Sequence, residues 1–411
     1  MSLDCREVIL MSNTPKIRFP EFKGEWKEYS LNELGDFYKG SGISKNDLSE
    51  VGNPCILYGE LYTIYKEVID SVKSKTNIDT KKMFYGKRND VLIPSSGETA
   101  IDIATASCLQ KDDVVLGGDL NIFRPKKVNG IFISYQLSNV KRTKIARLAQ
   151  GASVVHLYNE HLKKINVEIP HREEQDKIAK FLSLVDKKIS KQIEKINHLK
   201  TLRNGTMSKL FSQEIRFKKV DGENYPKWRN VTLVEILSEI NEKTKINNQH
   251  EVISSTTNGV FLQKEYFNRS IASDDNTGYK TLKRNQIVLS PQNLWMGNIN
   301  YNDKYDIGIV SPSYKIFDIN SKFDKNYIGY IVRTPRAFYE YMRASEQGAS
   351  IVRRNLNMDL FEQIVFNIPC KEEQERIAKY LNKLDIKINL EQEMVDKLIN
   401  WKKGLIQQIF I

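Results

Sequence analysis

The sequence predicts a mixed α+β protein with two α/β globular domains in a pseudo-twofold arrangement, separated by an antiparallel two-helix coiled coil. Three observations predict this class. They are an internal repeat of about 200 residues, a heptad pattern at the end of each repeat, and short apolar runs between turn residues elsewhere. A length of 411 residues suits two or three domains of ordinary size.

The internal repeat is clearest in residues 169–211 and 368–410, which align without a gap at an offset of 199 residues. Of these 43 positions, 16 are identical, including the shared opening Ile-Pro and the Glu-Glu-Gln that follows it. The tetrad Gln-Gly-Ala-Ser recurs at Gln150 and Gln347, and Trp26 and Trp228 open similar stretches. Self-similarity at a fixed period marks repeated structural units. We therefore expect two halves, each a globular body followed by a long helix.

The globular bodies are rich in short β-type runs that end in turn residues. We expect strands at 90–94, 114–116, 131–134, 286–290 and 308–310, and helices at 137–149 and 325–346. This mixture predicts an α/β body in each half rather than a helical bundle.

The two long helices are expected to begin after Pro170 and Pro369, with acidic residues in the first turn, where the helix dipole favours them. Their apolar residues follow a 4-3 spacing that is typical of a coiled coil, and its polar breaks fall in matching places. Antiparallel pairing would let the second helix return toward the first body. One hypothesis for the register places Arg203 opposite Glu391 and Gln192 opposite Lys402; the alternative is that these are solvated flank positions.

Composition excludes several classes of protein. No apolar run reaches the ~18 residues of a membrane span, and the N-terminus lacks the features of a secretory signal. The four cysteines are far apart and form no CxxC pair, and no HExxH is present, so neither a metal site nor a disulfide framework is expected. The cysteine usage fits a reducing cytoplasm.

The motifs of the common catalytic sites are missing from this sequence. It contains no phosphate-binding loop, no dinucleotide-binding fingerprint and no methyltransferase motif. The segment from Ser95 to Thr99 could be a nucleophile turn, but a turn at the end of a strand explains it better. We therefore expect no catalytic residue in this chain.

Basic and amide side chains occur instead in loop-like or helix-face positions of both bodies, and the net charge is +12. Lysine and arginine neutralise phosphates, whereas Arg, Asn and Gln can read base edges. Ordinary surface charge, and for 291–298 a packed core loop, are the alternatives. The candidate DNA-binding residues are Ser95, Ser96, Thr99, Lys141, Arg142, Lys144, Arg147, Lys283, Arg284, Gln292, Asn293, Trp295, Asn298, Arg336, Arg343, Arg353 and Arg354.

The repeated pattern Ile-Pro, Glu-Glu-Gln, Ile-Ala, Leu and Asp, which runs from Ile169 to Asp186 and again from Ile368 to Asp385, resembles the DNA-specificity subunit of type I restriction–modification systems. The resemblance covers the chain from about Thr14 onward. It implies two target-recognition domains, double-stranded DNA as ligand, two methyltransferase subunits as partners and, through them, two restriction subunits. It also implies that the chain has no cofactor of its own, because S-adenosylmethionine, ATP and magnesium are bound by the partners. It further implies a bacterial cytoplasmic protein that is associated with the nucleoid and involves no membrane.

With this resemblance, the expected boundaries are an N-terminal extension (1–13), a first target-recognition domain (14–168), a central spacer helix (169–211), a linker (212–221), a second target-recognition domain (222–367) and a C-terminal spacer helix (368–411). Because the loops of the two bodies differ, we expect a bipartite asymmetric DNA target whose unread spacer reflects the length of the helices.

Two partners related by symmetry need two related docking surfaces. The candidates are Glu173, Gln175, Glu372 and Gln374; helix capping is their alternative role. A coiled-coil scaffold with two adaptor domains and no DNA role is the competing class of function. A fused restriction–methylation enzyme is a further alternative, which the missing motifs oppose.

Overall fold

The computed structural model describes residues 14–411 except 152, 267–272 and 348–353. The expected N-terminal extension, 1–13, and the candidate Arg353 therefore lie outside the described residues. The chain divides into two compact units. Unit 1 runs to Lys195 and includes Glu391–Ile411, whereas unit 2 is Ile196–Leu390. Each unit thus contains one globular body, the beginning of one long helix and the end of the other.

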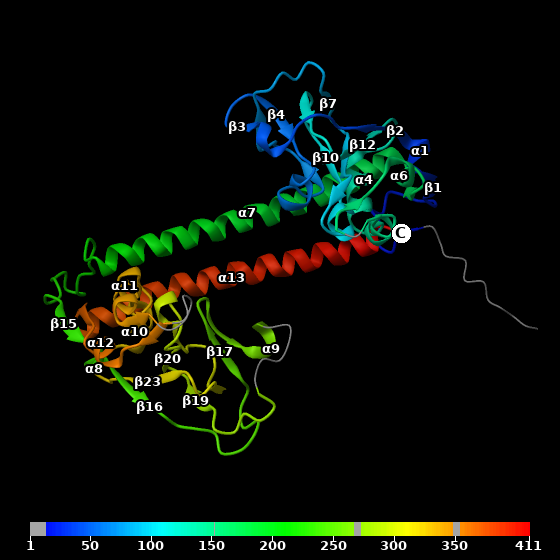
Figure 1. Ribbon diagram of the computed structural model, residues 1–411. Coiled ribbons are helices and arrows are strands. Elements are labelled where there is room, and N and C mark those ends of the chain that lie inside the picture. Colours follow the sequence, from blue (N-terminus) through cyan, green and yellow to red (C-terminus); the bar gives the residue numbers. More distant parts are fainter. Residues whose placement is uncertain (1–13, 152, 267–272, 348–353) are drawn as a thin grey trace, which may run out of the picture. The chain divides into compact units, whose positions relative to one another are not determined.

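The two long helices are continuous: α7 is Arg172–Phe211 and α13 is Lys371–Ile409 (Figure 1). They begin just after Pro170 and Pro369 and carry acids in their first turns, as the sequence predicted. Most of the apolar positions with 4-3 spacing are buried, for example Leu182 and Leu381 at 0% exposure.

The body of unit 1 contains two five-stranded sheets. The first has the order β2-β12-β8-β10-β5 and the second β3-β6-β4-β11-β7; two-stranded ladders join β1 to β14 and β9 to β13. The strands are β1 (Lys27–Ser30), β2 (Gly35–Lys39), β3 (Leu48–Ser49), β4 (Asn53–Ile56), β5 (Val68–Ile69), β6 (Ser74–Thr76), β7 (Phe84–Gly86), β8 (Val91–Pro94), β9 (Ser96–Gly97), β10 (Ser107–Leu109), β11 (Val114–Leu116), β12 (Leu120–Pro125), β13 (Val155–His156) and β14 (Asn166–Ile169). The helices are α1 (Leu31–Leu34), the 3₁₀ turn η1 (Lys45–Asp47), α2 (Glu60–Thr63), α3 (Ala100–Ile103), α4 (Gly130–Ser138), α5 (Arg142–Ala146) and α6 (Asn159–Leu162).

The body of unit 2 is built around one four-stranded sheet of order β16-β23-β20-β21, with four two-stranded ladders beside it. The strands are β15 (Arg229–Thr232), β16 (Leu237–Ile240), β17 (Ile253–Thr256), β18 (Gly259–Leu262), β19 (Lys280–Lys283), β20 (Ile287–Leu289), β21 (Ile299–Tyr301), β22 (Ile307–Val310), β23 (Lys315–Ile319), β24 (Ser345–Gln347), β25 (Arg354–Leu356) and β26 (Val365–Ile368). The helices are α8 (Leu233–Ile236), α9 (Gln263–Tyr266), the 3₁₀ turn η2 (Leu294–Met296), α10 (Lys325–Ile331), α11 (Pro335–Arg343) and α12 (Met358–Glu362).

In each unit the main core joins the body to both helical segments. In unit 1, Phe410 contacts the rings of Trp26 and Phe132, with centroid separations of 6.3 and 5.1 Å. In unit 2, the ring of Phe211 lies 5.5 Å from that of Tyr327, in a core that also contains Leu381. Because burial of aromatic rings is a large source of stability, the helix ends are integral parts of both units.

Three predictions about local structure were wrong. The expected helix at 137–149 is the end of α4 and the separate helix α5, which ends at Ala146. Residues 131–134 belong to helix α4 rather than to a strand, because the side chain of Asn129 caps the helix by accepting from the amides of Ile131 and Phe132. A short apolar run that is buried on all sides does not distinguish the two structures. The expected helix at 325–346 is two helices, since Thr334 caps α11 and Pro335 occupies its first turn.

The hypothesis about the register of the coiled coil was also wrong. Within unit 2, the Arg203 guanidinium binds Asp385, with Nε to Oδ1 at 3.1 Å. Within unit 1, Gln192 binds its own repeat equivalent, Glu391, and the Lys402 ammonium binds Asp186 at 2.8 Å. These pairs establish antiparallel packing of the helical segments inside each unit.

Candidate nucleic-acid interface

In unit 2, a loop meets two later segments, which follow each other in the sequence, at one face of the body. They are the loop 291–298 after β20, helix α11, and the β24–β25 hairpin. The amide of Arg354 donates to the carbonyl of Gln292 at 3.4 Å, and the Arg354 guanidinium lies 4.7 Å from the centroid of the Trp295 ring. The predicted residues Gln292, Asn293, Trp295 and Arg354 are therefore neighbours.

Helix α11, whose Phe338 ring lies against Gly297 of this loop, exposes a basic and aromatic side. Arg336, Tyr339 and Arg343 are exposed and follow the spacing of one helix face, whereas Ala337 and Tyr341 are buried. The Arg343 guanidinium lies 6.0 Å from the centroid of the Tyr339 ring and 3.2 Å from Glu340. Such a side can bind phosphates through its cations and bases through its ring.

Three other candidates in unit 2 have partners in the protein, one of them in the core and two in exposed ion pairs. The side chain of Asn298 is buried and exchanges two hydrogen bonds with Ser255, at 2.7 and 3.0 Å. Lys283 forms an ion pair with Glu242 and Arg284 one with Asp306. The loop 291–298 is thus partly exposed and partly buried. Its first half can contact a ligand, whereas its last residue is buried and cannot.

Unit 1 builds a related face from equivalent segments. Strand β9 in the loop after β8 pairs with β13, and the Ser96 hydroxyl lies 3.0 Å from Nδ1 of His156. Helix α3 packs on α5, where the Arg142 guanidinium donates to the carbonyl of Ile101 at 3.0 Å. The segments predicted around Ser95 and Arg142 therefore do come together.

Within this face, several predicted side chains are buried or already bound to other residues of the protein. Ser95 and Ser96 are buried, Thr99 caps α3 through the amide of Asp102, and Lys141 forms an ion pair with Glu168 at 2.6 Å. The exposed basic candidates of unit 1 are Lys144 and Arg147.

Sequence reasoning missed the apolar part of both faces. Ile101, Val154 and Tyr158 are exposed beside the face of unit 1, and Met296, Tyr339 and Met342 beside that of unit 2. The repeated Gln-Gly-Ala-Ser tetrad is the signal that could have located them. Gln150 bridges to His156 just as Gln347 pairs with Arg354, so the first residue of the tetrad begins an antiparallel pairing in both units.

The lead-in to each long helix is held by a buried glutamine. Gln175 donates to the carbonyl of Pro170 at 2.9 Å and accepts from the amide of Asn129 at 2.9 Å. Gln374 makes the same two bonds, to Pro369 and from Asp324. These two docking candidates are therefore structural clamps, whereas Glu173 and Glu372 are exposed.

A second clamp, which sequence reasoning missed, ties the N-terminal segment of each unit to its helix. Arg18 binds Glu174 through two bonds of 2.8 and 2.7 Å, and Arg216 binds Glu373 through two of 3.0 and 2.6 Å. Residues 212–221, predicted as a linker, are thus attached to unit 2 through Arg216. The tripeptide Ile-Arg-Phe at 17–19 and 215–217 was the available signal.

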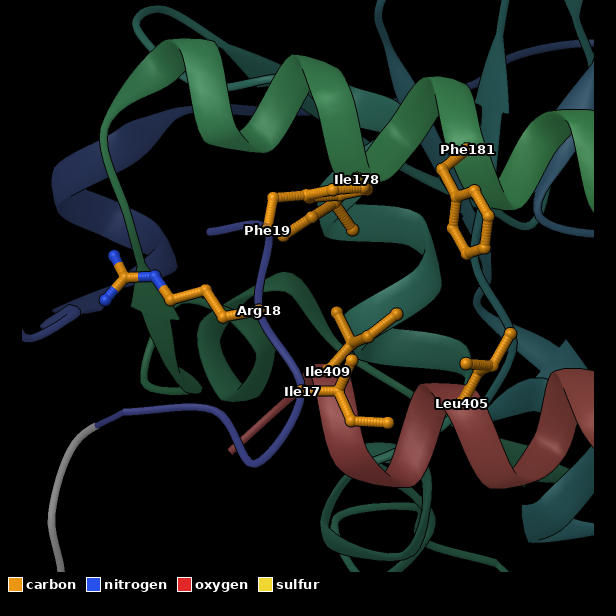
Figure 2. A pocket seen from close by; sticks show the side chains of 7 residues that line it. All are labelled: Ile17, Arg18, Phe19, Ile178, Phe181, Leu405 and Ile409. Carbon is orange, nitrogen blue, oxygen red and sulfur yellow. The ribbon is translucent and has the colours of Figure 1, made fainter. Parts of the chain in front are cut away.

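Beside these clamps, each unit exposes an aromatic surface. In unit 1 a pocket of about 100 Å³ is lined by Ile17, Arg18, Phe19, Ile178, Phe181, Leu405 and Ile409 (Figure 2). The Phe181 ring meets those of Phe19 and Trp401 edge-on, at 5.9 and 6.3 Å. In unit 2 the equivalent rings of Phe217 and Tyr380 are 5.8 Å apart. We call these sets the lead-in surfaces.

The described residues contain neither a candidate metal site nor a membrane-spanning helix. No group of three or more His, Cys, Asp or Glu side chains in the described ranges could hold a metal ion. Among the helices of that part of the chain, none is long and apolar enough to cross a membrane.

The chain thus contains two copies of an α/β body, each attached to antiparallel helical segments and each with a basic and aromatic face. This is the architecture of a recognition protein with two related domains. The chain belongs to the family described as the type I restriction modification DNA specificity domain, whose model matches residues 23–200 and again 225–399.

Known proteins agree with this assignment along almost the whole chain. The type I restriction enzyme MjaVIII specificity subunit of Methanocaldococcus jannaschii is 24% identical over 97% of this chain and 96% of its own. The crystal structure of a type I restriction-modification S subunit from M. genitalium has a similar fold, with a TM-score of 0.61, 17% identity and coverage of 97% and 99%. A chain from a structural study of assembly and conformational transition in the type I R-M system matches with a TM-score of 0.53, 12% identity and coverage of 94% and 97%.

Proposed function

We propose that this chain directs N6-adenine methylation, or ATP-driven cleavage, by partner subunits to a bipartite asymmetric DNA site. In this proposal the bodies within 14–168 and 222–367 each read one half-site, and the chain contributes no catalytic group. S-adenosylmethionine, ATP and magnesium would be bound by two methyltransferase and two restriction subunits. The specificity-subunit name of the M. jannaschii relative supports this assignment.

The observation that carries the proposal is that equivalent segments build both faces but supply different side chains. Unit 2 presents Gln292, Trp295 and Arg354, while unit 1 presents Lys144, Arg147 and Tyr158. Cations fix a protein on the phosphate backbone, whereas base-edge contacts and DNA shape carry the sequence information. Two faces with different chemistry would therefore select two different half-sites.

The test is to sequence the methylated sites in DNA modified by the complex assembled with its methyltransferase subunits. We expect a split site with two unlike halves. Gln292→Ala should relax only one half, by about 10-fold or more in discrimination. Lys144→Ala should weaken binding to all sequences alike and lower the salt dependence. A continuous or palindromic site would contradict the proposal, and salt-insensitive binding of duplex DNA by the complex would favour the scaffold alternative.

We further propose that one methyltransferase subunit docks on each lead-in surface. The surfaces occur once per unit at equivalent positions, which suits two copies of one partner. Each combines exposed rings with an exposed glutamate, Glu173 or Glu372, and aromatic side chains are the commonest anchors of protein interfaces.

Docking on the lead-in surfaces can be tested by replacing exposed rings, which leaves the hydrophobic core unchanged. Trp401→Ser in unit 1 and Tyr380→Ser in unit 2 should each reduce the bound methyltransferase subunits from two to one, measured as the mass of the complex in solution. The double variant should bind neither. The matched control is Glu173→Ala with Glu372→Ala, which should weaken docking less. Full complex formation by the double serine variant would refute this surface.

A further inference from the structure

The β17–β18 hairpin of unit 2 exposes its turn and buries its strands. The strands pair from Ile253 opposite Leu262 to Thr256 opposite Gly259, which leaves Thr257 and Asn258 as the two turn residues. Both are exposed, whereas Ile253 and Val260 lie in a core cluster. The hairpin is therefore a fixed support for a short polar tip.

Buried amides fasten this hairpin to the candidate recognition loop. The Ser255 hydroxyl donates to Oδ1 of Asn298, the last residue of the loop 291–298. The Nδ2 of Asn300 donates to the Ser255 hydroxyl and to the carbonyl of Thr256, both at 2.8 Å. Because buried polar networks are costly unless all members are paired, this one favours a single position of the hairpin beside the loop.

Arg333 holds the tip itself. One guanidinium nitrogen donates to the carbonyl of Thr257 at 2.8 Å and another to Oδ1 of Asn300. Among the ion pairs of the described residues, none gives Arg333 a carboxylate, and burial together with nearby Arg203 lowers the pKa of its guanidinium. A cation that no carboxylate neutralises thus lies at the base of the tip, two residues before α11.

We propose that the tip residues Thr257 and Asn258 contact bases in the half-site read by unit 2, and that Arg333 is the positioning residue that holds them there. This inference rests on the proposed function. An asparagine amide can pair with an adenine edge through two hydrogen bonds, and a threonine can donate, accept and pack on a thymine methyl group. A tip that is already ordered loses little conformational freedom on binding.

Unit 1 differs at the equivalent place, which gives the tip a role in asymmetry. The strand that matches β17 is β4, because β4 pairs in parallel with β11 just as Val252, beside β17, pairs in parallel with Ile309 of β22. Strand β4 leads into helix α2 instead of a hairpin turn. There the Glu60 carboxylate binds the amide of Leu57 at 2.7 Å and the hydroxyl of Ser74. A buried carboxylate replaces the polar tip, so the two half-sites would be read with different elements.

The experiment uses the full chain in complex with its methyltransferase subunits and reads out methylated sites by sequencing. Asn258→Ala should lower discrimination at one or two positions of one half-site, on the order of 10-fold, and leave the other half-site unchanged. Asn258→Asp should shift the preferred base, because a carboxylate only accepts hydrogen bonds. An unchanged half-site in both variants would overturn the inference. Failure of the wild-type complex to methylate a split site would instead overturn the proposed function.

Arg333 variants test the positioning role. Arg333→Met should relax the positions affected by Asn258→Ala, and the double variant should relax them no further than Arg333→Met alone, since that change already releases the tip. Arg333→Lys, which keeps one donor nitrogen and the charge, should restore part of the discrimination. A uniform loss of methylation at all sites in Arg333→Met, with no change in preference, would leave Arg333 as a phosphate contact and refute its positioning role.

Discussion

Units 1 and 2 use the same scaffold contacts and differ where they would read DNA. Both have the clamp between arginine and glutamate, Arg18 with Glu174 and Arg216 with Glu373. Both also bond a tyrosine to a helix aspartate, Tyr135 to Asp186 and Tyr330 to Asp385. The two faces share the backbone pairing at the tetrad glutamines, Gln150 with His156 and Gln347 with Arg354, but present different exposed side chains.

The scaffold contacts are nevertheless not identical, and their differences are informative. The indole nitrogen of Trp228 donates to Glu373 at 3.1 Å, whereas that of Trp26 is buried without a partner. The aspartate of unit 1 binds Lys402, which also binds Glu67 at 3.2 Å, while that of unit 2 binds Arg203. Unit 2 therefore has an additional bond at its arginine–glutamate clamp, from Trp228, and unit 1 has an additional carboxylate near its aspartate, that of Glu67.

The largest effect is expected from removal of the clamp arginines. Arg18→Met would leave the carboxylate of Glu174, with 1% side-chain exposure, without its arginine. Breaking a buried ion pair on one side costs about 3–5 kcal/mol. Arg216→Met should cost less, because Glu373 keeps the bond from Trp228.

The measurement is hydrogen exchange of the whole chain, resolved by peptide, so that each unit is followed separately. Arg18→Lys and Arg216→Lys are the matched controls and should retain most of the stability. Equal losses from the two methionine variants would contradict the proposed role of Trp228.

A smaller loss of stability is expected from changes at the aspartates, and here unit 2 should lose more than unit 1. Asp385→Asn removes the carboxylate that Arg203 binds, whereas after Asp186→Asn the ammonium of Lys402 still has Glu67. We expect a loss of about 1–3 kcal/mol in unit 2 and a smaller loss in unit 1. Regional urea unfolding, followed by pulse proteolysis, would measure both. A larger loss in unit 1 would show that Glu67 does not substitute for Asp186.

The long helices and the duplication could be predicted from the sequence, because a heptad stripe and an ungapped repeat are local signals. The register could not, since a heptad stripe accepts shifts of one turn. The observed bond from Gln192 to Glu391 joins two equivalent positions of the repeat, and the polar breaks alone did not indicate it.

The candidate site was predicted in part. Gln292, Trp295 and Arg354 were chosen separately and do meet, because strand-end loops and the segment after the tetrad converge at one edge of the body. Lys141 and Asn298 were chosen by residue type, and type does not reveal that Glu168 and Ser255 bind them. The β17–β18 hairpin was missed, although Asn258-Gly259 is a turn signal; the observed turn residues, Thr257 and Asn258, are displaced from it by one position.

The smallest expected difference between the units is their response to alkaline pH. Cys55 and Cys108 are fully buried in unit 1, and burial raises the pKa of both thiols, that of Cys55 to about 11. The unfolded chain ionises its thiols near pH ~8.5. The stability due to the protonated buried thiols is therefore complete below that pH and is lost as the pH rises toward 11.

Each buried thiol should cost unit 1 up to about 1.4 kcal/mol per pH unit in this window. The described part of unit 2 has no fully buried cysteine, since Cys370 is partly exposed. The buried tyrosines of unit 2 affect its stability only above pH ~10, where tyrosine ionises in the unfolded chain.

The measurement is the urea concentration at the unfolding midpoint of each unit, taken at pH 8.5 and at pH 9.8. From the lower to the higher pH, this midpoint should fall in unit 1 and change little in unit 2. The double variant Cys55→Ala with Cys108→Ala should be less stable at pH 8.5, because it leaves cavities, but should lose no further stability at pH 9.8. An equal fall in both units, or a pH response that survives in the double variant, would contradict the assignment to these two thiols.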